Sequence, residues 1–382
     1  MNVLHSQNTH RSSVVWESGY ALNNVLKCRH HENSVKKIRR DPRMDAYLQQ
    51  AGFYGVAKLP FIQLDNALIT SLVERWRLET HTFHMANGKT TITMQDVAIQ
   101  QGLPVEGDAV VGYTSMDFHA VCEHLLREAP PRGAMKAGMM KMSWLSSRFD
   151  VLHPEASKVL VRMHTRAYIL QLIGAMIFPD KSNNLVHLMW LPLLEDFERA
   201  GTYSWGSACL AWLYRQLCRA SQKNASQVAG CLVLLQTWAW DRFPHLSPIR
   251  RRSRQVQGMP LVARWGAALD TKTIASHVLS VIREALDRQI PSRVVGELVF
   301  RSSASALSNG ISLIEPFVNL EKYNWCLKML ILIKNFIKLT CEESIRIIGH
   351  TSTTTSLPCG RIYIITSSLY TGMILRTIKD GT

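Results

Sequence analysis

Two histidine pairs, His30-His31 and His81-x-x-His84, are the residues of this chain best suited to metal chemistry. Zinc takes four ligands from cysteine, histidine and carboxylate side chains, and each pair supplies only two. We expect a strand around His81 and His84, where residues three apart point to opposite faces. We therefore interpret these histidines as surface or hydrogen-bonded residues and predict no metal site.

Nucleophilic or redox chemistry would need cysteines in a paired or activated setting. The eight cysteines are instead widely scattered, and no two form a C-x-x-C pair; they are Cys28, Cys122, Cys209, Cys218, Cys231, Cys326, Cys341 and Cys359. This scatter argues against a zinc ribbon and against a small disulfide framework. We predict reduced, mostly buried thiols in an intracellular protein.

Basic residues suggest a second chemistry, the binding of phosphate or of acidic partners. The formal net charge is +15 and the pI is near 9.6, which favours association with nucleic acid, acidic proteins or anionic lipid. The first basic cluster is Arg250, Arg251, Arg252 and Arg254, and the second is Lys36, Lys37, Arg39 and Arg40. Because the first cluster has no acidic neighbours, we interpret it as a nuclear localisation signal or a phosphate contact; the alternative is a solvated loop.

Four tryptophans, at positions 205, 212, 238 and 240, could stack on nucleic-acid bases. Trp205 and Trp212 are two helical turns apart and share a face, whereas Trp238 and Trp240 diverge. Because an aromatic stripe on a helix normally faces the core, we favour a core pair plus a rim residue over a stacking platform. We predict that Trp205, Trp212 and Trp238 are core residues.

The elements that must position these side chains are mainly helices. Apolar periodicity predicts helices over residues 65–78, 157–178, 185–199, 204–220, 225–242 and 271–288. We expect an extended arm over residues 1–45 and a loop over residues 130–143. The longest apolar run, Trp325 to Leu339, is interrupted by lysines and is too short for a membrane span.

A small hairpin is predicted near residues 82–93. Asn87-Gly88 lies between two β-prone segments, and both positions of such a turn favour positive φ. Thr93 is then expected to cap a short helix with Asp96 as its partner, and Gly102 to end it.

Several sequence blocks follow one another along the first three quarters of the chain: Leu4-His5-Ser6-Gln7, Gly52-Phe53, Trp76 to His84, Thr91 to Ala98, Gly102 to Gly107, Tyr203 to Cys218, and Leu235 to Arg242. Their order resembles the plant mobile domain, found in transposon-derived genes and in maintenance-of-meristems-like proteins. The resemblance covers about residues 3–294. It marks these residues as structural: Trp76, Asp96, Trp205, Gly206, Tyr214, Trp238 and Trp240.

The family pattern stops at about residue 295, where a Ser-rich stretch leads into an Ile-, Lys- and Thr-rich tail. We therefore predict a plant mobile domain over residues 3–294, truncated at its C-terminal end, and a non-family tail over residues 295–382 that is poorly ordered or incidental. Residues 361–365 could form a strand, but they have no obvious pairing partner nearby.

The resemblance also brings an "aminotransferase-like" label and relatives fused to a metal-dependent phosphatase. Pyridoxal-phosphate chemistry needs a lysine and a phosphate cradle, and no lysine here has a strand-loop setting beside a Gly/Ser-rich turn. A two-metal phosphatase needs Gly-Asp and Gly-Asn-His turns; the chain has Gly107-Asp108 but no Gly-Asn-His. We predict no catalytic, cofactor-binding or metal-binding residue, no cofactor, and no enzyme.

Together these observations predict a mainly α fold, a layered multi-helix domain with a small β-hairpin followed by an atypical tail. The resemblance implies a non-enzymatic nuclear scaffold in meristem maintenance, genome stability and transposon silencing. Its expected partners are nuclear proteins, including a phosphatase-like partner, and nucleic acid or chromatin, but no membrane. The alternative is a transposon-derived protein that binds nucleic acid directly, as a degenerate copy.

Overall fold

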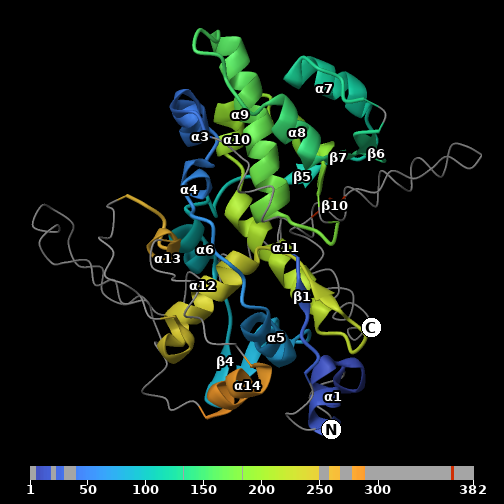
Figure 1. Cartoon of the computed structure of the whole chain (residues 1–382), viewed down its shortest axis with the longest axis vertical. Helices are drawn as coiled ribbons and strands as arrows, with labels where there is room; N and C mark the ends of the chain where they lie inside the picture. Colours follow the sequence, from blue (N-terminus) through green and yellow to red (C-terminus); the bar gives the residue numbers. More distant parts are fainter. Residues whose placement is uncertain are drawn as a thin grey trace, which may run out of the picture. The chain divides into compact units, whose positions relative to one another are not determined.

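Helices form most of the described structure, which confirms the mainly α fold expected from the sequence (Figure 1). The computed structural model describes residues 6–18, 23–29, 40–131, 133–182, 184–248, 258–266 and 278–288, and the strand residues 363–364. All of them belong to one unit, which comprises residues 1–296 and 361–382. Among these residues, no helix is long and apolar enough to cross a bilayer.

The four longest helices are α5 (Asn66–Arg75), α9 (Lys158–Leu172), α11 (Trp205–Ala220) and α12 (Leu232–Arg242). The Asp65 side chain caps α5, and the Ser157 hydroxyl caps α9, by accepting backbone N–H groups of the first turn. Residues 232–241 of α12 are buried on every side, as expected for a helix in the middle of a core.

Shorter helices surround these four: α1 (Arg11–Ser18), α3 (Asp45–Gln50), α4 (Tyr54–Ala57), α6 (Met94–Gln101), α7 (Phe118–Leu126), α8 (Met142–Arg148), α10 (Phe197–Gly201), α13 (Ala263–Gly266) and α14 (Leu279–Asp287). Short 3-10 turns span Gln7–Thr9, Pro42–Met44, Leu188–Trp190, Pro192–Leu194 and Pro244–Leu246. Helix α6 packs against α11 and α12, and α14 packs against α5 (Figure 1).

The strands are short and form four small sheets. One three-stranded sheet has the order β2 (Trp76–Arg77), β3 (Thr82–Met85), β4 (Gly88–Thr90). The other has the order β6 (Met135–Lys136), β7 (Met139–Lys141), β8 (Leu185–His187). The other two pair β1 (Lys27–Cys28) with β9 (Gln227–Val228), and β5 (Val111–Gly112) with β10 (Tyr363–Ile364). Residues 363–364 therefore do have a pairing partner, contrary to the sequence-based expectation. The rest of the predicted tail, 295–382, lies outside the described residues.

The predicted hairpin is confirmed, but its turn is shifted by one residue. Met85 pairs with Gly88, so the two loop residues are Ala86 and Asn87 rather than Asn87 and Gly88. Gly88 has a φ of +125°, which a residue with a side chain rarely adopts. The helix cap beyond it is as predicted: Thr93 and Asp96 form a reciprocal capping box, and Gly102 ends α6 with a φ of +65°.

Two sequence predictions are wrong. Residues 130–143 were expected to be a loop, but β6 and β7 pair across a tight turn at Ala137-Gly138, whose φ angles are +49° and +76°. Both positions need positive φ, and alanine at the first hides the signal. Residues 185–199 were expected to be one helix, yet the segment begins with β8, because pairing with β7 overrides its helical periodicity. It continues as 3-10 turns and α10.

Two further helices are shorter than predicted. The first, over residues 65–78, ends at Arg75, because Trp76–Arg77 pairs with β3. The last of the four long helices starts at Leu232 rather than at residue 225, because Gln227–Val228 pairs with β1. A strand pair decides the boundary in both cases, a local one with β3 in the first and a long-range one with β1 in the second.

Candidate functional site

Most of the residues marked by the family resemblance gather in the core. Trp76 is fully buried and contacts the rings of Phe83 and Tyr214 edge-on, with centroids 4.9 and 4.8 Å away. Trp238, also fully buried, lies 5.3 Å from Phe83. The Tyr214 hydroxyl, 2.5 Å from the Ile92 carbonyl, ties α11 to the end of the hairpin. These aromatic residues hold α5, α11 and α12 against the β2-β3-β4 sheet.

A second part of the core surrounds Trp205, at the start of α11. Trp205 is fully buried, and its indole N–H donates to the Ala200 carbonyl at 2.8 Å. The next residue, Gly206, donates its N–H to the Pro104 carbonyl at 2.7 Å. A Cβ on Gly206 would lie 2.8 Å from the Val105 side chain, so this close approach requires glycine.

Trp240 and Trp212 differ in burial. Trp240 is buried against Trp265, with ring centroids 4.9 Å apart, although it diverges from Trp238 on α12. Trp212 is half-buried, and its indole N–H donates to the Pro179 carbonyl at 3.0 Å. Trp212 is therefore the rim residue of the set, and the prediction that it is a core residue is wrong.

The predicted basic clusters fall largely outside the described residues. Arg250, Arg251, Arg252 and Arg254 all lie there, as do Lys36, Lys37 and Arg39. Arg40 is described, and its guanidinium forms an ion pair with Asp45 at 2.9 Å. Their proposed roles in nuclear import or phosphate binding stay predictions.

The histidine and cysteine side chains of the described chain have structural surroundings. His81 stacks on Tyr214, with ring centroids 6.1 Å apart, and His84 shares a hydrogen bond with Thr80; His30 and His31 lie outside the described residues. Within the described ranges, no three His, Cys, Asp or Glu side chains gather as metal ligands would. Burial raises the pKa of Cys122 to about 12, which disfavours the thiolate a nucleophile needs.

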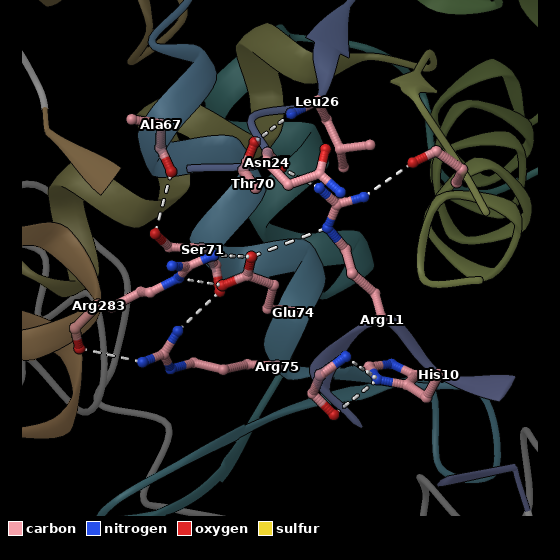
Figure 2. A network of polar contacts seen from close by, with 12 residues as sticks. His10, Arg11, Asn24, Leu26, Ala67, Thr70, Ser71, Glu74, Arg75 and Arg283 are labelled. Atoms are coloured by element: carbon pink, nitrogen blue, oxygen red, sulfur yellow. Dashed lines mark hydrogen bonds and ion pairs between the residues drawn. The ribbon is translucent and has the colours of Figure 1, made fainter. Parts of the chain in front are cut away.

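A buried ionic network joins the N-terminal arm to α5 and α14 (Figure 2). Arg283 donates from Nε and Nη2 to the two carboxylate oxygens of Glu74, at 2.8 and 2.6 Å. Arg11 approaches the same carboxylate with Nε at 3.8 Å and donates to the Ala225 carbonyl at 2.8 Å. All three side chains are almost completely buried, so the charges depend on one another for solvation.

His10, which precedes Arg11 in the chain, connects the N-terminal arm to the β2 strand. Its Nε2 donates to the Trp76 carbonyl at 2.7 Å, and its Nδ1 faces the Arg77 guanidinium at 2.8 Å. Burial, with Arg77 nearby, lowers the pKa of His10 from 6.5 to about 4. The imidazole is therefore neutral at neutral pH and acts as a fixed hydrogen-bonding group.

A second buried polar group, centred on Asp241, joins α6, α12 and α13. Its carboxylate accepts hydrogen bonds from Gln100 and Arg264, and burial raises its pKa. The neighbouring Arg242 forms an ion pair with Asp96 at 3.3 Å, so the family residue Asp96 serves both the helix cap and this contact. These interactions connect α6, α12 and α13.

In contrast to these buried polar networks, one site is a concave pocket that opens to solvent. It lies between β8, α11 and a π-helical turn at Ile173–Ile177 that extends α9, and we call it the β8–α11 pocket. Its volume is about 390 Å³, and its wall includes Phe178, Trp190 and the half-buried Trp212. A larger, shallower cavity of about 620 Å³ lies beside α4 and α6, but none of the described side chains lining it is charged.

The π-helical turn shapes the pocket. The Phe178 N–H donates to the Ile173 carbonyl, five residues back, at 2.7 Å, which widens the helix before Pro179 ends it. Gly174 allows this turn to lie against β8, because a Cβ there would be 2.7 Å from the Val186 side chain. Such π-turns occur often at functional sites.

Charged and polar side chains surround the opening of the β8–α11 pocket. Lys181, Arg215 and Arg219 line it together with one acid, Asp180, whose carboxylate accepts the Ser182 N–H at 2.8 Å. His187 also lines it, and burial lowers its pKa, so it adds no charge at neutral pH. The rim therefore has a net charge of +2, from three cations and one anion.

Sequence reasoning did not identify this pocket. Its residues come mainly from the π-helical turn Ile173–Ile177 and the segment after it, from β8 and the 3-10 turn that follows it, and from α11. The segment of β8 was predicted to be helical. The signals that were present are Gly174 and the block Phe178-Pro179-Asp180, which ends the predicted helix. Nothing in the sequence pattern shows that this ending opens a cavity against α11.

Comparison with known proteins places the chain among plant proteins. The sequence model of the plant mobile domain matches residues 52–302. Three Arabidopsis thaliana relatives each match over 77% of this chain: "Serine/threonine-protein phosphatase 7 long form homolog" at 41% identity, "Protein MAIN-LIKE 2" at 39% and "Protein MAINTENANCE OF MERISTEMS" at 36%. The matches cover 22%, 44% and 60% of these relatives, so the chain spans less than two thirds of their length. No solved structure matches the chain.

Proposed function

Because the chain belongs to the plant mobile domain family, we propose that it is a non-enzymatic nuclear binding module. Its proposed roles are meristem maintenance, genome stability and transposon silencing. The names of two relatives, "Protein MAIN-LIKE 2" and "Protein MAINTENANCE OF MERISTEMS", support the first of these. The chain's own surface must then supply the contacts to other nuclear components.

The observation that carries this proposal is the β8–α11 pocket. It combines an apolar wall, a cationic rim and a position beside an edge strand, which are the parts of a recognition site. A catalytic site would be expected to hold titratable groups poised near neutral pH. In the β8–α11 pocket, the imidazole among the described lining residues is His187, and burial lowers its pKa.

The proposed partners are nuclear proteins, including a phosphatase-like protein. One relative is named a phosphatase 7 long form homolog, and this chain corresponds to 22% of it. A domain similar to this chain thus occurs within a longer protein with that name, which supports a phosphatase-like protein as a partner of this chain.

Affinity purification of the tagged chain from plant nuclei, with and without nuclease, tests the binding function. We expect specific nuclear proteins to stay bound after nuclease treatment. Loss of every partner after nuclease would favour the second candidate, direct nucleic-acid binding, which the net charge of +15 supports. Recovery of no specific partner in either condition would contradict both.

Nuclear import is tested by replacing Arg250, Arg251, Arg252 and Arg254 with alanine in a tagged chain too large to diffuse through nuclear pores. We expect the tagged chain to move to the cytoplasm. The same replacement of Lys36, Lys37, Arg39 and Arg40 measures the contribution of the second cluster. If both variants stay nuclear, neither cluster is the import signal.

A further inference from the structure

The β8–α11 pocket contains a buried carboxamide without a protein partner. Gln216, on α11, lines the pocket and is only 2% exposed, yet its side chain forms no hydrogen bond with any described residue. Its amide atoms are not among the fully buried polar atoms that lack a hydrogen-bond partner, so they face accessible space in the pocket. A group that binds in the pocket would satisfy both the donor and the acceptor of this amide.

The pocket also borders the open edge of a sheet. β8 is an outer strand of the β6-β7-β8 sheet, and all three of its residues, Leu185, Val186 and His187, line the pocket. Alternate strand residues point to opposite faces, so contact with three in a row indicates that the pocket meets the edge or end of the strand. An edge strand presents unpaired N–H and C=O groups, which an extended peptide can pair with.

The interior of the pocket suits an apolar side chain. Phe178 and Trp190 are nearly buried, with ring centroids 4.9 Å apart, and Met189 and Met139 complete the apolar lining. Methionine adapts its shape to different ligands. A volume of about 390 Å³ is at the small end for ligand sites, which suits one anchoring side chain rather than a whole folded element.

The rim selects the charge of the ligand. Lys181 and Arg219 are exposed, and Arg215 lies over the Trp212 ring with its guanidinium carbon 5.9 Å from the ring centroid. The single acid, Asp180, is already engaged by Ser182. A basic ligand would be repelled and an acidic one attracted.

The same features disfavour a nucleic-acid strand. Single-strand binding needs exposed aromatic faces for stacking and a groove of cations that follows the backbone. Phe178 and Trp190 are 6% and 3% exposed, so only Trp212 offers an accessible ring, and the cations surround a single pocket.

We propose that the β8–α11 pocket binds an extended acidic peptide segment of a partner protein. The peptide main chain pairs with the edge of β8, Gln216 hydrogen-bonds one of its peptide groups, and one apolar side chain enters the pocket. Acidic residues beside that anchor meet Lys181, Arg215 and Arg219. This inference rests on the proposed binding function and names the chemistry of the partner.

The test uses the purified full chain and pools of fluorescein-labelled heptapeptides. One pool has apolar or aromatic central residues flanked by Asp and Glu, a second has the same centres flanked by Lys and Arg, and a third has acidic flanks with Gly and Ser centres. Fluorescence anisotropy should show binding of the first pool at least about tenfold tighter than of the other two. Equal binding of all pools, or none of the first, overturns the proposal.

Variants and modified peptides locate the binding. Gln216→Leu and Arg219→Glu should each weaken binding of the best acidic peptide roughly tenfold, whereas Lys89→Glu, an exposed charge reversal in β4, should leave it unchanged. A peptide N-methylated at alternate residues should bind in one methylation register and fail in the other, because only one set of N–H groups faces β8. This comparison uses only the unaltered protein. If both methylated peptides bind, or if neither binds, the result argues against strand pairing with β8.

A single-stranded oligonucleotide pool covers the other class of ligand. If it displaces the peptide and Gln216→Leu loses oligonucleotide affinity, the pocket is a nucleic-acid site and the peptide assignment is wrong. If Gln216→Leu still retains the nuclease-resistant nuclear partners in full, the pocket assignment fails while the proposed binding function stands.

Discussion

Two buried polar regions of this protein differ in how completely the chain itself satisfies them. At the N-terminal arm, both carboxylate oxygens of Glu74 accept hydrogen bonds from Arg283, and Arg11 lies beside them. In the β8–α11 pocket, the Gln216 side chain forms no hydrogen bond with a described residue, and its amide atoms stay accessible in the pocket. The first arrangement stabilises the fold, and the second leaves hydrogen-bonding capacity for another molecule.

The difference also concerns which parts of the chain are connected. The Glu74 network joins the arm, α5 and α14, and its hydrogen bond to Arg283 spans 209 residues of sequence. The pocket lies between the π-helical turn Ile173–Ile177, β8 and α11, and its interior is lined by apolar side chains. Substitutions should therefore reduce stability in the first region and reduce binding in the second.

The largest effect is expected from Glu74→Ala. Removing this carboxylate leaves two buried guanidinium groups without their counter-ion, so the free energy of unfolding should fall by about 3–5 kcal/mol. Urea denaturation followed by far-UV circular dichroism measures the change. The control is Glu284→Ala, which removes an exposed ion pair with Arg288 and should cost less than about 1 kcal/mol. Equal losses of unfolding free energy in the two variants would show that the buried network contributes no more than an exposed ion pair.

A comparable loss is expected when a core tryptophan is removed. Trp205→Ala should lower the free energy of unfolding by about 3–5 kcal/mol, because a fully buried indole leaves a large cavity. Trp212→Ala should lower it less, because this ring is half-buried, and should weaken peptide binding instead. If Trp205→Ala melts like the unaltered protein, Trp205 is not the core residue that its burial indicates.

The sequence predicts the long helices well because their apolar periodicity is local. Ser204 before α11, the capping box of Thr93 and Asp96, and the stop at Phe243-Pro244 are all visible in a few neighbouring residues. The short strands are different. Leu185–His187 reads as part of a helix until β7 lies beside it, so its conformation depends on residues more than 40 positions away.

The candidate site is even less predictable, because it depends on the absence of a contact. Gln216 lies in a helix with ordinary periodicity, and only the packed structure shows that no described side chain reaches its amide. Likewise, Arg11 and Arg283 are unremarkable basic residues in the sequence until the fold buries both beside Glu74. Residue type and spacing record local conformation, whereas these features arise from long-range packing.

A pH-dependent loss of stability is the next largest expected effect. The pKa of His10 is about 4 in the folded protein, against 6.5 for an ordinary histidine, because burial and Arg77 disfavour its charged form. Between these values the unfolded chain binds the proton and the folded chain does not, so stability falls as the pH drops from 6.5 to 4. Over this pH window, His10 protonation lowers the free energy of unfolding by up to roughly 3 kcal/mol. Above pH 6.5 and below pH 4 the effect of His10 no longer changes with pH.

Replacement of His10 with glutamine isolates this contribution. Glutamine keeps a donor for the Trp76 carbonyl and an acceptor for Arg77 but does not titrate. Urea midpoints at pH 7, 5.5 and 4.5 should fall more steeply for the unaltered protein than for His10→Gln. The pKa values of His81, His164 and His187 are also lowered by burial, so the difference between the two proteins is the relevant quantity. Parallel curves would show that His10 protonates as easily in the folded state.

The smallest effect on stability is expected from Gln216→Leu, and it separates the two regions most sharply. In the folded protein the Gln216 amide forms no hydrogen bond with a described residue and stays accessible in the pocket, so it contributes little to the free energy of unfolding. Leucine has a similar size, needs no hydrogen bond and fits beside Trp212 and Met139, so the free energy of unfolding should stay within about 0.5 kcal/mol or rise.

Urea denaturation measures it alongside Gln236→Leu, the matched control. Gln236 is buried too, but it donates to the Gln63 carbonyl at 2.8 Å and accepts the Asp65 N–H at 2.6 Å. Loss of those bonds should cost about 1–3 kcal/mol. If instead Gln216→Leu destabilises the protein as much as Gln236→Leu, then Gln216 is satisfied within the fold, and its role in binding a peptide has no basis.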